Sequence, residues 1–394
     1  MTVDPESAPG ISKTVVLAAG MMLATGAVWI GGVQGSRMAA LFGLGGLLGL
    51  ILYHASFGFT SAWRRLLVNG DGRGLRAQLV MLALATIIFL PAISGGTLFG
   101  QQVVGAIAPV GISVAVGAFI FGIGMQLGGG CASGTLFAVG GGSTRVAVTL
   151  AGFVAGSVIA TLHMPWWVAQ PNMGSISLVR ELGMAPAMVV QLTVFAAIAW
   201  ASLVWQRRSL GVHHPAPKSV APLPARILRG PWPLMGGAVG LAILNIATLA
   251  VSGHPWSITF GFSLWGAKLL ALGGVDVAAW EFWTWPYPAR ALAGSVLAED
   301  TSVMNFGILL GAFLAAGLAG KFAPDFRVPF RPLVAAILGG LLLGYGARLA
   351  FGCNIGAFFS GVASGSLHGW LWLVCALAGN WIGLRLRPHF ALFN

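Results

Sequence analysis

The sequence predicts an all-α polytopic membrane protein with about ten transmembrane helices and glycine-interrupted re-entrant segments arranged in two inverted repeats. Three observations support this prediction. Only 8% of the 394 residues are charged and 57% are hydrophobic, whereas an average soluble domain carries about 25% charged residues. Several runs of about 17–20 residues contain almost no charge, which is the length that crosses a ~30 Å hydrocarbon core. A motif of glycines around one cysteine occurs twice.

The apolar runs are continuous rather than alternating in polarity, so they predict helices rather than strands of a barrel. The predicted spans cover residues 15–33, 38–54, 77–94, 111–130, 145–163, 186–205, 233–252, 302–320, 332–350 and 367–384.

Basic residues predict the orientation of these spans. The net charge of +12 is concentrated in four segments, 63–76, 206–230, 321–331 and 385–387. Placing all four segments on the cytoplasmic side follows the positive-inside rule. This placement requires an even number of spans between consecutive basic segments, and the predicted spans meet this requirement. Both termini are then cytoplasmic, and the first span is retained because it lacks the features of a signal peptide. No basic helix alternates with aromatic residues, so we expect the lipid bilayer and not a nucleic acid as partner.

A linker rich in proline and arginine divides the chain. We predict a first half at 1–205 with spans 1–6 and repeat one at about 38–163. The linker covers 206–230 and is cytoplasmic, and the second half, 231–394, contains spans 7–10 and repeat two. Two roles for the linker stay open: it holds the halves together, or it docks a cytosolic sulfur-carrier protein.

The repeats are visible as two pairs of motifs in the same order. Segment 122–134, with Cys131, matches segment 344–356, with Cys353, and Phe-Gly-Phe at 57–59 matches Phe-Gly-Phe at 260–262. The first cysteine follows a span that runs inward and the second follows one that runs outward. The repeats therefore insert with opposite topology, which predicts a transport site near the midplane at their interface.

The residues after each cysteine, 133–139 and 355–362, are apolar enough for short half-helices. The N-terminus of a half-helix presents unpaired N–H groups and a positive dipole end, which attract an anion. If the segments dip into the membrane, Cys131 and Cys353 meet in the centre. If the spans before them cross fully, the cysteines lie at opposite surfaces.

Several further residues are candidates for the substrate path. Arg348 places a guanidinium group within a span. This group either binds an oxyanion or extends to the lipid headgroups. Lys268 and Arg65 occupy matching positions as entrance charges or interfacial anchors. The remaining candidates are the glycines of the motifs and three polar side chains: Gly130, Gly134, Gly352, Gly356, Gly58, Gly261, Gln126, Asn354 and His54.

Other features need no ligand. Cys375 lies in a plain apolar span and is interpreted as packing, and segment 280–288 is typical of an interfacial stretch on the outer face. Three cysteines and scattered histidines give no metal-ligand spacing. We therefore expect no metal, cofactor or catalytic residue.

The Gly-Cys motifs at 130–134 and 352–356, with segment 54–65, resemble the YeeE/YedE family of sulfur-compound transporters over about residues 38–385. The resemblance implies an inverted-repeat transporter of the bacterial inner membrane that imports thiosulfate for cysteine synthesis. It also implies that thiosulfate passes along thiols, a role that falls on Cys131 and Cys353. Thiosulfate-importing relatives carry a further cysteine where this sequence has Gly58.

Two alternatives to thiosulfate import follow. A transporter or channel for another sulfur or selenium species, such as sulfite, sulfide or a selenium oxyanion, would use the same path. A membrane redox protein would use Cys131 and Cys353 as a thiol pair, but the motifs offer no general base beside them.

Overall fold

The computed structural model describes residues 10–210 and 223–392. Within these ranges, ten helical spans are long and apolar enough to cross a membrane. Their main helices are α1 (Lys13–Gln34), α2 (Ser36–His54), α4 (Arg73–Gly95), α5 (Ile112–Gly128), α7 (Thr144–Val168), α9 (Met184–Leu210), α11 (Leu234–Ser252), α15 (Asp300–Ala319), α16 (Phe330–Leu349) and α18 (Leu367–Leu386). All ten predicted spans are present, and the polytopic all-α fold is confirmed.

Shorter helices and four short strands connect these spans. The helices are α3 (Phe59–Asn69), α6 (Ala132–Gly140), α8 (Leu178–Leu182), α10 (Leu223–Arg229), α12 (Thr259–Leu272), η2 (Val277–Ala279), α13 (Glu281–Thr284), α14 (Pro286–Ala293), η3 (Val296–Ala298), η4 (Asn354–Ser360), α17 (Gly361–Ala363) and η5 (Arg387–Phe390). The strands form two antiparallel pairs, β1 (Thr97–Leu98) with β2 (Gln101–Gln102) and β3 (Pro109–Gly111) with β4 (Asn172–Ser175).

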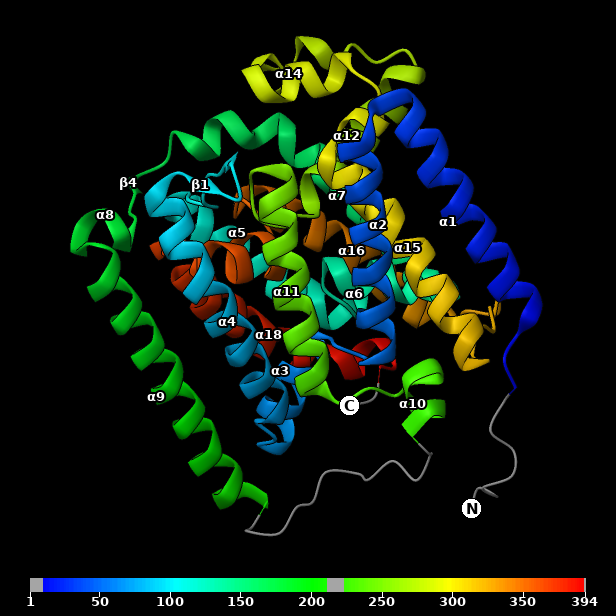
Figure 1. The fold of residues 1–394 in the computed structure, drawn as a ribbon, viewed down its shortest axis with the longest axis horizontal. Coiled ribbons are helices and arrows are strands. Elements are labelled where there is room, and N and C mark those ends of the chain that lie inside the picture. The colour runs from blue at the N-terminus through cyan, green and yellow to red at the C-terminus, as the bar shows by residue number, and fades with distance from the viewer. Residues whose placement is uncertain (1–9, 211–222, 393–394) are drawn as a thin grey trace.

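Figure 1 shows the two ends of the molecule. The α3 face contains α3, α10 and the last turn of α9, whereas the α14 face contains α14. Helices α2 and α15 run from the α14 face toward the α3 face, and α4 and α11 run the opposite way. The predicted linker starts inside α9, because this helix continues to Leu210; residues 211–222 of the linker lie outside the described residues.

The spans are joined by close backbone contacts at glycine. A Cβ atom on Gly311 of α15 would lie 1.9 Å from the carbonyl oxygen of Gly46 on α2. A Cβ on Gly339 of α16 would likewise lie 2.2 Å from the amide nitrogen of Gly128 on α5. Small residues allow membrane helices to approach closely and gain van der Waals contact. These glycines therefore set the spacing of the bundle.

The contacts between helices follow the same pattern in both halves. Helix α2 packs on α15 as α11 packs on α4, and α7 packs on α16 as α18 packs on α5. The two outlying helices also match, since α1 packs on α15 and α9 packs on α4. Segment 280–288, which we expected at the outer interface, forms part of a cap made of α13, α14 and their flanking residues (280–294). Its Phe282 and Trp283 are buried, with the Trp283 indole donating to Thr161 of α7.

Candidate functional site

Each cysteine forms the N-terminal boundary of a short buried helix. Cys131 precedes α6, where its sulfur accepts a hydrogen bond from the Gly134 amide at 3.4 Å. Cys353 precedes η4, where its sulfur accepts from the Ile355 amide at 3.4 Å. The half-helices predicted after both cysteines are thus present, and each thiol lies at the positive end of a helix dipole.

Glycine has two roles beside the cysteines. Gly352 has φ of +150°, a conformation that side chains with a Cβ rarely adopt, and a Cβ there would lie 2.6 Å from the Ala357 amide nitrogen. The later glycines of the two motifs keep space open beside the site instead. A Cβ on Gly134 would face the Cys131 sulfur at 3.5 Å, and one on Gly356 would face the Ser257 hydroxyl at 3.2 Å.

The two cysteines come together inside the protein. Helix α6 contacts η4, and Cys131 and Cys353 directly precede these two helices. Both side chains have 0% relative exposure. Of the two arrangements that the sequence left open, the structure has the central one, with the cysteines at one buried region rather than at opposite surfaces.

The segment around Gly58 adds a third element to this region. Gly58 precedes α3, and the backbone amide of the next residue, Phe59, faces the Cys131 sulfur. A Cβ on Gly58 would lie 3.0 Å from the Ser61 hydroxyl, so a larger residue there needs a small shift of that side chain. Its counterpart Gly261 lies within α12 and packs on α15, where a Cβ would lie 3.0 Å from the Asn305 side chain.

Aromatic rings pack around η4. Phe59 and Trp63 of α3 contact Phe358 of η4, with ring centroids 6.2 and 6.0 Å apart. Trp372 of α18 joins Phe121 of α5 to this group at 5.5 Å. The rings come from both halves of the chain and are buried. Buried apolar rings lower the local dielectric, which strengthens any electrostatic contact made there.

Two of the polar candidates lie close to the cysteines in the chain. Asn354 is the first residue of η4, and its buried side-chain oxygen and nitrogen have no hydrogen-bond partner among the described residues. The Gln126 side chain donates to Asn380 at 2.7 Å, while its own buried oxygen has no such partner. Buried polar groups are normally paired, so the free Asn354 amide is a candidate ligand group.

His54 and Arg348 lie at opposite ends of the molecule. His54 ends α2, where its ring packs 5.3 Å from Trp232 and neither ring nitrogen has a partner among the described residues. Arg348 is near the end of α16, and its guanidinium lies 5.3 Å from the Phe282 ring of the cap. Lys268, an expected entrance charge or interfacial anchor, donates to the carbonyl oxygens of Leu292 and Gly294 and so ties α12 to the cap.

One supporting group was not identified from the sequence. The Asn245 side chain of α11 accepts from the Trp256 amide at 2.7 Å and donates to the Ser360 hydroxyl at 3.3 Å. Ser360 in turn donates to the Trp256 carbonyl oxygen at 2.8 Å. These contacts hold loop 253–258 against η4. The sequence feature that could have identified Asn245 is an asparagine inside an apolar span.

Ten apolar spans around two buried half-helices place the chain in the class of multi-pass membrane proteins. The sequence profile of a family described as sulphur transport matches residues 54–382, and the chain belongs to this family. The description of this family is a transport function rather than an enzyme activity.

Individual relatives agree with this assignment. A stretch of 165 residues, 41% of the chain, is 34% identical to the probable transporter YedE of Escherichia coli and covers 40% of that protein. The chain is 27% identical over 366 residues to the thiosulfate transporter TsuA of Spirochaeta thermophila, with 86% of the chain and 95% of that protein covered. TsuA of Escherichia coli is 24% identical over 359 residues, with 88% and 94% covered. The match to YedE thus spans about two fifths of that relative's length, and the matches to TsuA span nearly all of it.

Proposed function

We propose that this protein imports thiosulfate across the bacterial inner membrane along a central path that passes Cys131 and Cys353. The observation that carries this proposal is the contact between α6 and η4, which come from different halves of the chain and each follow a buried cysteine. The two TsuA relatives, which match over nearly their whole length, are named thiosulfate transporters.

The two halves, 1–205 and 231–394, act as inverted repeats joined by the linker at 206–230. The exchanged packing of α2 on α15 and of α11 on α4 supports this proposal, as do their opposite directions in Figure 1. Because α1 and α9 pack on equivalent helices, each repeat would include one further span. For the first repeat, this span lies outside the predicted range 38–163. A path between such repeats is lined by equivalent groups approaching from both sides.

The α3 face is proposed to be cytoplasmic, together with both termini. Arginines of α3, of the last turn of α9 and of α10 all lie at this end, as the positive-inside rule requires. The linker's second proposed role, docking a cytosolic sulfur-carrier protein, would place that partner on this face.

The site offers the contacts that a small sulfur oxyanion needs. The backbone amides at the starts of α6 and η4 and the positive ends of their dipoles favour negative charge. A protonated thiol donates a weak hydrogen bond, which suits the terminal sulfur of thiosulfate. The Asn354 amide adds a donor beside Cys353, and the glycines of the two motifs leave room for the anion. Arg348, toward the α14 face, contributes positive charge on the approach.

Gly58 supports a second candidate substrate class. Without a thiol at this position, the α3 side of the path offers the Phe59 amide near Cys131 but no third sulfur. Sulfite, sulfide or a selenium oxyanion would need fewer thiol contacts than thiosulfate. These species use the same path in this alternative.

Uptake of ³⁵S-labelled thiosulfate by cells that lack their own importers tests the proposal. The gene should confer uptake above an empty vector, and excess unlabelled thiosulfate should abolish the signal. Competition by sulfite or selenite that is stronger than competition by thiosulfate would favour the second class. No uptake at confirmed membrane levels would contradict thiosulfate as substrate.

A further inference from the structure

A polar pocket of about 650 Å³ lies at the α3 face, between the last turns of α3 and α9. Figure 1 shows both helices ending at this end of the molecule. Residues 70 and 71 of the turn that joins α3 to α4, together with Arg73 of α4, complete the lining. The pocket is separate from the cysteine site, since neither cysteine has any exposed surface.

The turn between α3 and α4 is fixed against α9. Gly70 has φ of +69°, and a Cβ there would lie 2.6 Å from the Ser209 side chain. The Gly72 amide donates to the Gln206 side-chain oxygen at 3.2 Å, and Arg76 donates to the same oxygen at 2.8 Å. The walls of the pocket are therefore bonded to one another, which gives it a defined shape.

The pocket has an excess of positive charge. Its charged side chains are Arg65, Arg73 and Asp71. Arg73 donates to both carboxylate oxygens of Asp71, at 2.9 and 2.8 Å. These hydrogen bonds hold the pKa of Asp71 below its ordinary value, although burial opposes the shift, so the carboxylate stays ionised. Two positive charges against one negative charge leave a net charge of +1.

Donors on both arginines remain available to an anion. Arg65 is exposed and donates no hydrogen bond to any residue in the ranges 10–210 and 223–392. The Nη1 atom of Arg73 is buried and also has no partner within these ranges. Buried donors are normally paired, and guanidinium groups bind phosphate and carboxylate oxygens in two-pronged fashion. An anion held in the pocket can therefore accept from Arg65 and Arg73 together.

The exposed side chains around the pocket place it beside the bilayer. Trp205 of α9 lines the pocket and has 56% relative exposure, and tryptophan favours the membrane–water interface. Val68 of α3 also belongs to the lining and is 48% exposed. Earlier on α9, Trp200 is 70% exposed, as expected for a helix that faces acyl chains. The pocket thus lies at the level of the lipid headgroups.

We propose that this pocket binds the phosphate of an anionic phospholipid from the cytoplasmic leaflet, with Arg65 and Arg73 as its ligands. The cytoplasmic leaflet is rich in negative charge, and basic pockets beside transmembrane helices bind such headgroups. Free inorganic phosphate has the same chemistry, but the exposed Trp205 and Val68 favour an occupant with an apolar tail. The inference uses the proposed orientation and does not depend on which anion is transported.

The bound lipid joins three helices. Arg65 lies on α3 and Arg73 on α4, while α9 forms the opposite wall. Helix α9 packs mainly on α4 and is otherwise largely exposed, so an additional contact with it stabilises the bundle. Helix α3 begins at Phe59, whose amide faces Cys131. The lipid therefore supports a helix that extends from the headgroups to the cysteine site.

Thermal unfolding of the purified full-length protein in a neutral detergent tests this inference. Phosphatidylglycerol, which has one negative charge, should raise Tm, whereas phosphatidylcholine and inorganic phosphate should raise it much less. Arg65→Gln should weaken the apparent affinity for phosphatidylglycerol roughly fivefold, the contribution of one arginine beside an anionic headgroup. Ser209→Glu, which adds a negative charge to the pocket, should weaken it as well. Arg229→Gln, at an exposed position on α10 at the same face, is the matched control and should respond as wild type.

Native mass spectrometry provides a second readout, because wild type and Arg229→Gln should retain a phosphatidylglycerol molecule that Arg65→Gln loses. Without lipid, all variants should unfold near the wild-type Tm, since the replaced side chains are exposed. Equal stabilisation by phosphatidylcholine and phosphatidylglycerol, or a wild-type response in Arg65→Gln, would contradict the site. Inorganic phosphate as effective as phosphatidylglycerol would overturn the lipid as occupant. None of these measurements involves uptake, so this inference and the transport proposal can fail separately.

Discussion

Asn245 shows how one buried polar residue shapes the site. Its amide joins three parts of the chain: α11, which carries it, loop 253–258 through Trp256, and η4 through Ser360. It is fully buried in an apolar span, where a polar group costs free energy unless it is hydrogen-bonded. Its contacts therefore position the half-helix that begins at Cys353.

Replacing Asn245 by leucine should destabilise the protein by about 1–3 kcal/mol, because the buried Trp256 amide loses its acceptor. Thermal unfolding of the purified protein, followed by near-ultraviolet circular dichroism, measures the effect. Asn69→Leu, at an exposed position on α3, is the control and should change stability little. Equal stability of both variants would show that Asn245 does not hold the loop.

At this scale the sequence predicted the residue types of the site but not their partners. Cys131 and Cys353 were identified because the same motif occurs twice. The approach of the Phe59 amide to Cys131, and of Ser257 to Gly356, brings together residues far apart in the chain. No local pattern encodes such contacts, since they arise from tertiary packing.

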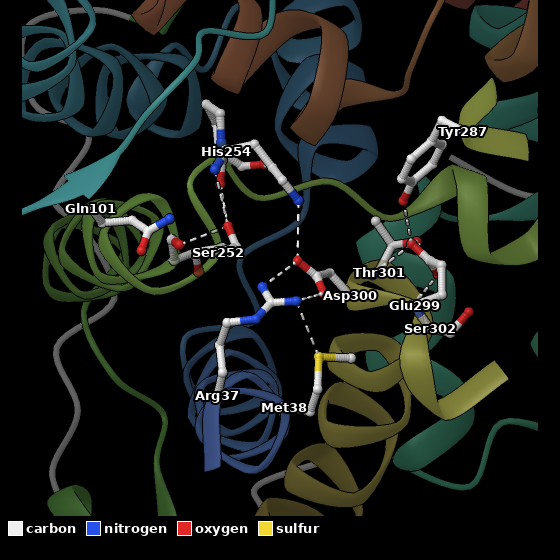
Figure 2. Close-up of polar contacts among 12 residues, drawn as sticks. Arg37, Met38, Gln101, Ser252, His254, Tyr287, Glu299, Asp300, Thr301 and Ser302 are labelled. Atoms are coloured by element: carbon white, nitrogen blue, oxygen red, sulfur yellow. Dashed lines mark hydrogen bonds and ion pairs between the residues drawn. The ribbon is translucent and has the colours of Figure 1, made fainter. Parts of the chain in front are cut away.

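At the scale of elements, the helices approach one another most closely at glycines. The backbone of Gly46 on α2 approaches Gly311 on α15 so closely that no side chain fits at Gly311. Interiors are packed at the density of organic crystals, and such contacts cannot relax without separating the helices. The same two helices are joined near the α14 face by the ion pair of Arg37 on α2 with Asp300 on α15 (Figure 2).

Gly311→Val should therefore destabilise the bundle by about 1–3 kcal/mol or more, the usual cost of overpacking. Its yield in the membrane and its Tm should both fall. Gly20→Val in α1 is the matched control, because no atom outside its own helix backbone and chain neighbours lies within 4 Å of a Cβ at that position. A Gly311 variant as stable as the control would contradict the proposed role of the contact.

The long spans were predictable because length and hydropathy define them without reference to neighbours. The boundaries of the helices differ from the predicted ones. The third span is predicted to begin at residue 77, whereas α4 begins at Arg73. The helix α12 was not assigned, because its 14 residues are fewer than the ~20 that cross a bilayer. Its place is set by contacts with α7, α15 and α16, which the sequence does not show.

At the scale of the whole molecule, equivalent helices exchange partners between the halves. The half-helices α6 and η4 meet where these exchanged pairs surround them, and their cysteines share one buried region. The sequence motifs predicted two related halves, and topology predicted a central site. The placement of α1 and α9 on matching helices was not foreseen, since these spans carry no shared motif.

Thiosulfate uptake in single-cysteine variants tests the central claim most directly. Cys131→Ala and Cys353→Ala are compared with wild type and with Cys375→Ala, the control, at equal membrane levels. Loss of a hydrogen bond to a charged ligand is worth about 1.5–3 kcal/mol, or roughly tenfold or more in rate. We predict that uptake falls by at least about tenfold in the first two variants and stays near wild type in the third. Wild-type uptake in both Cys131→Ala and Cys353→Ala would contradict a path that passes these thiols.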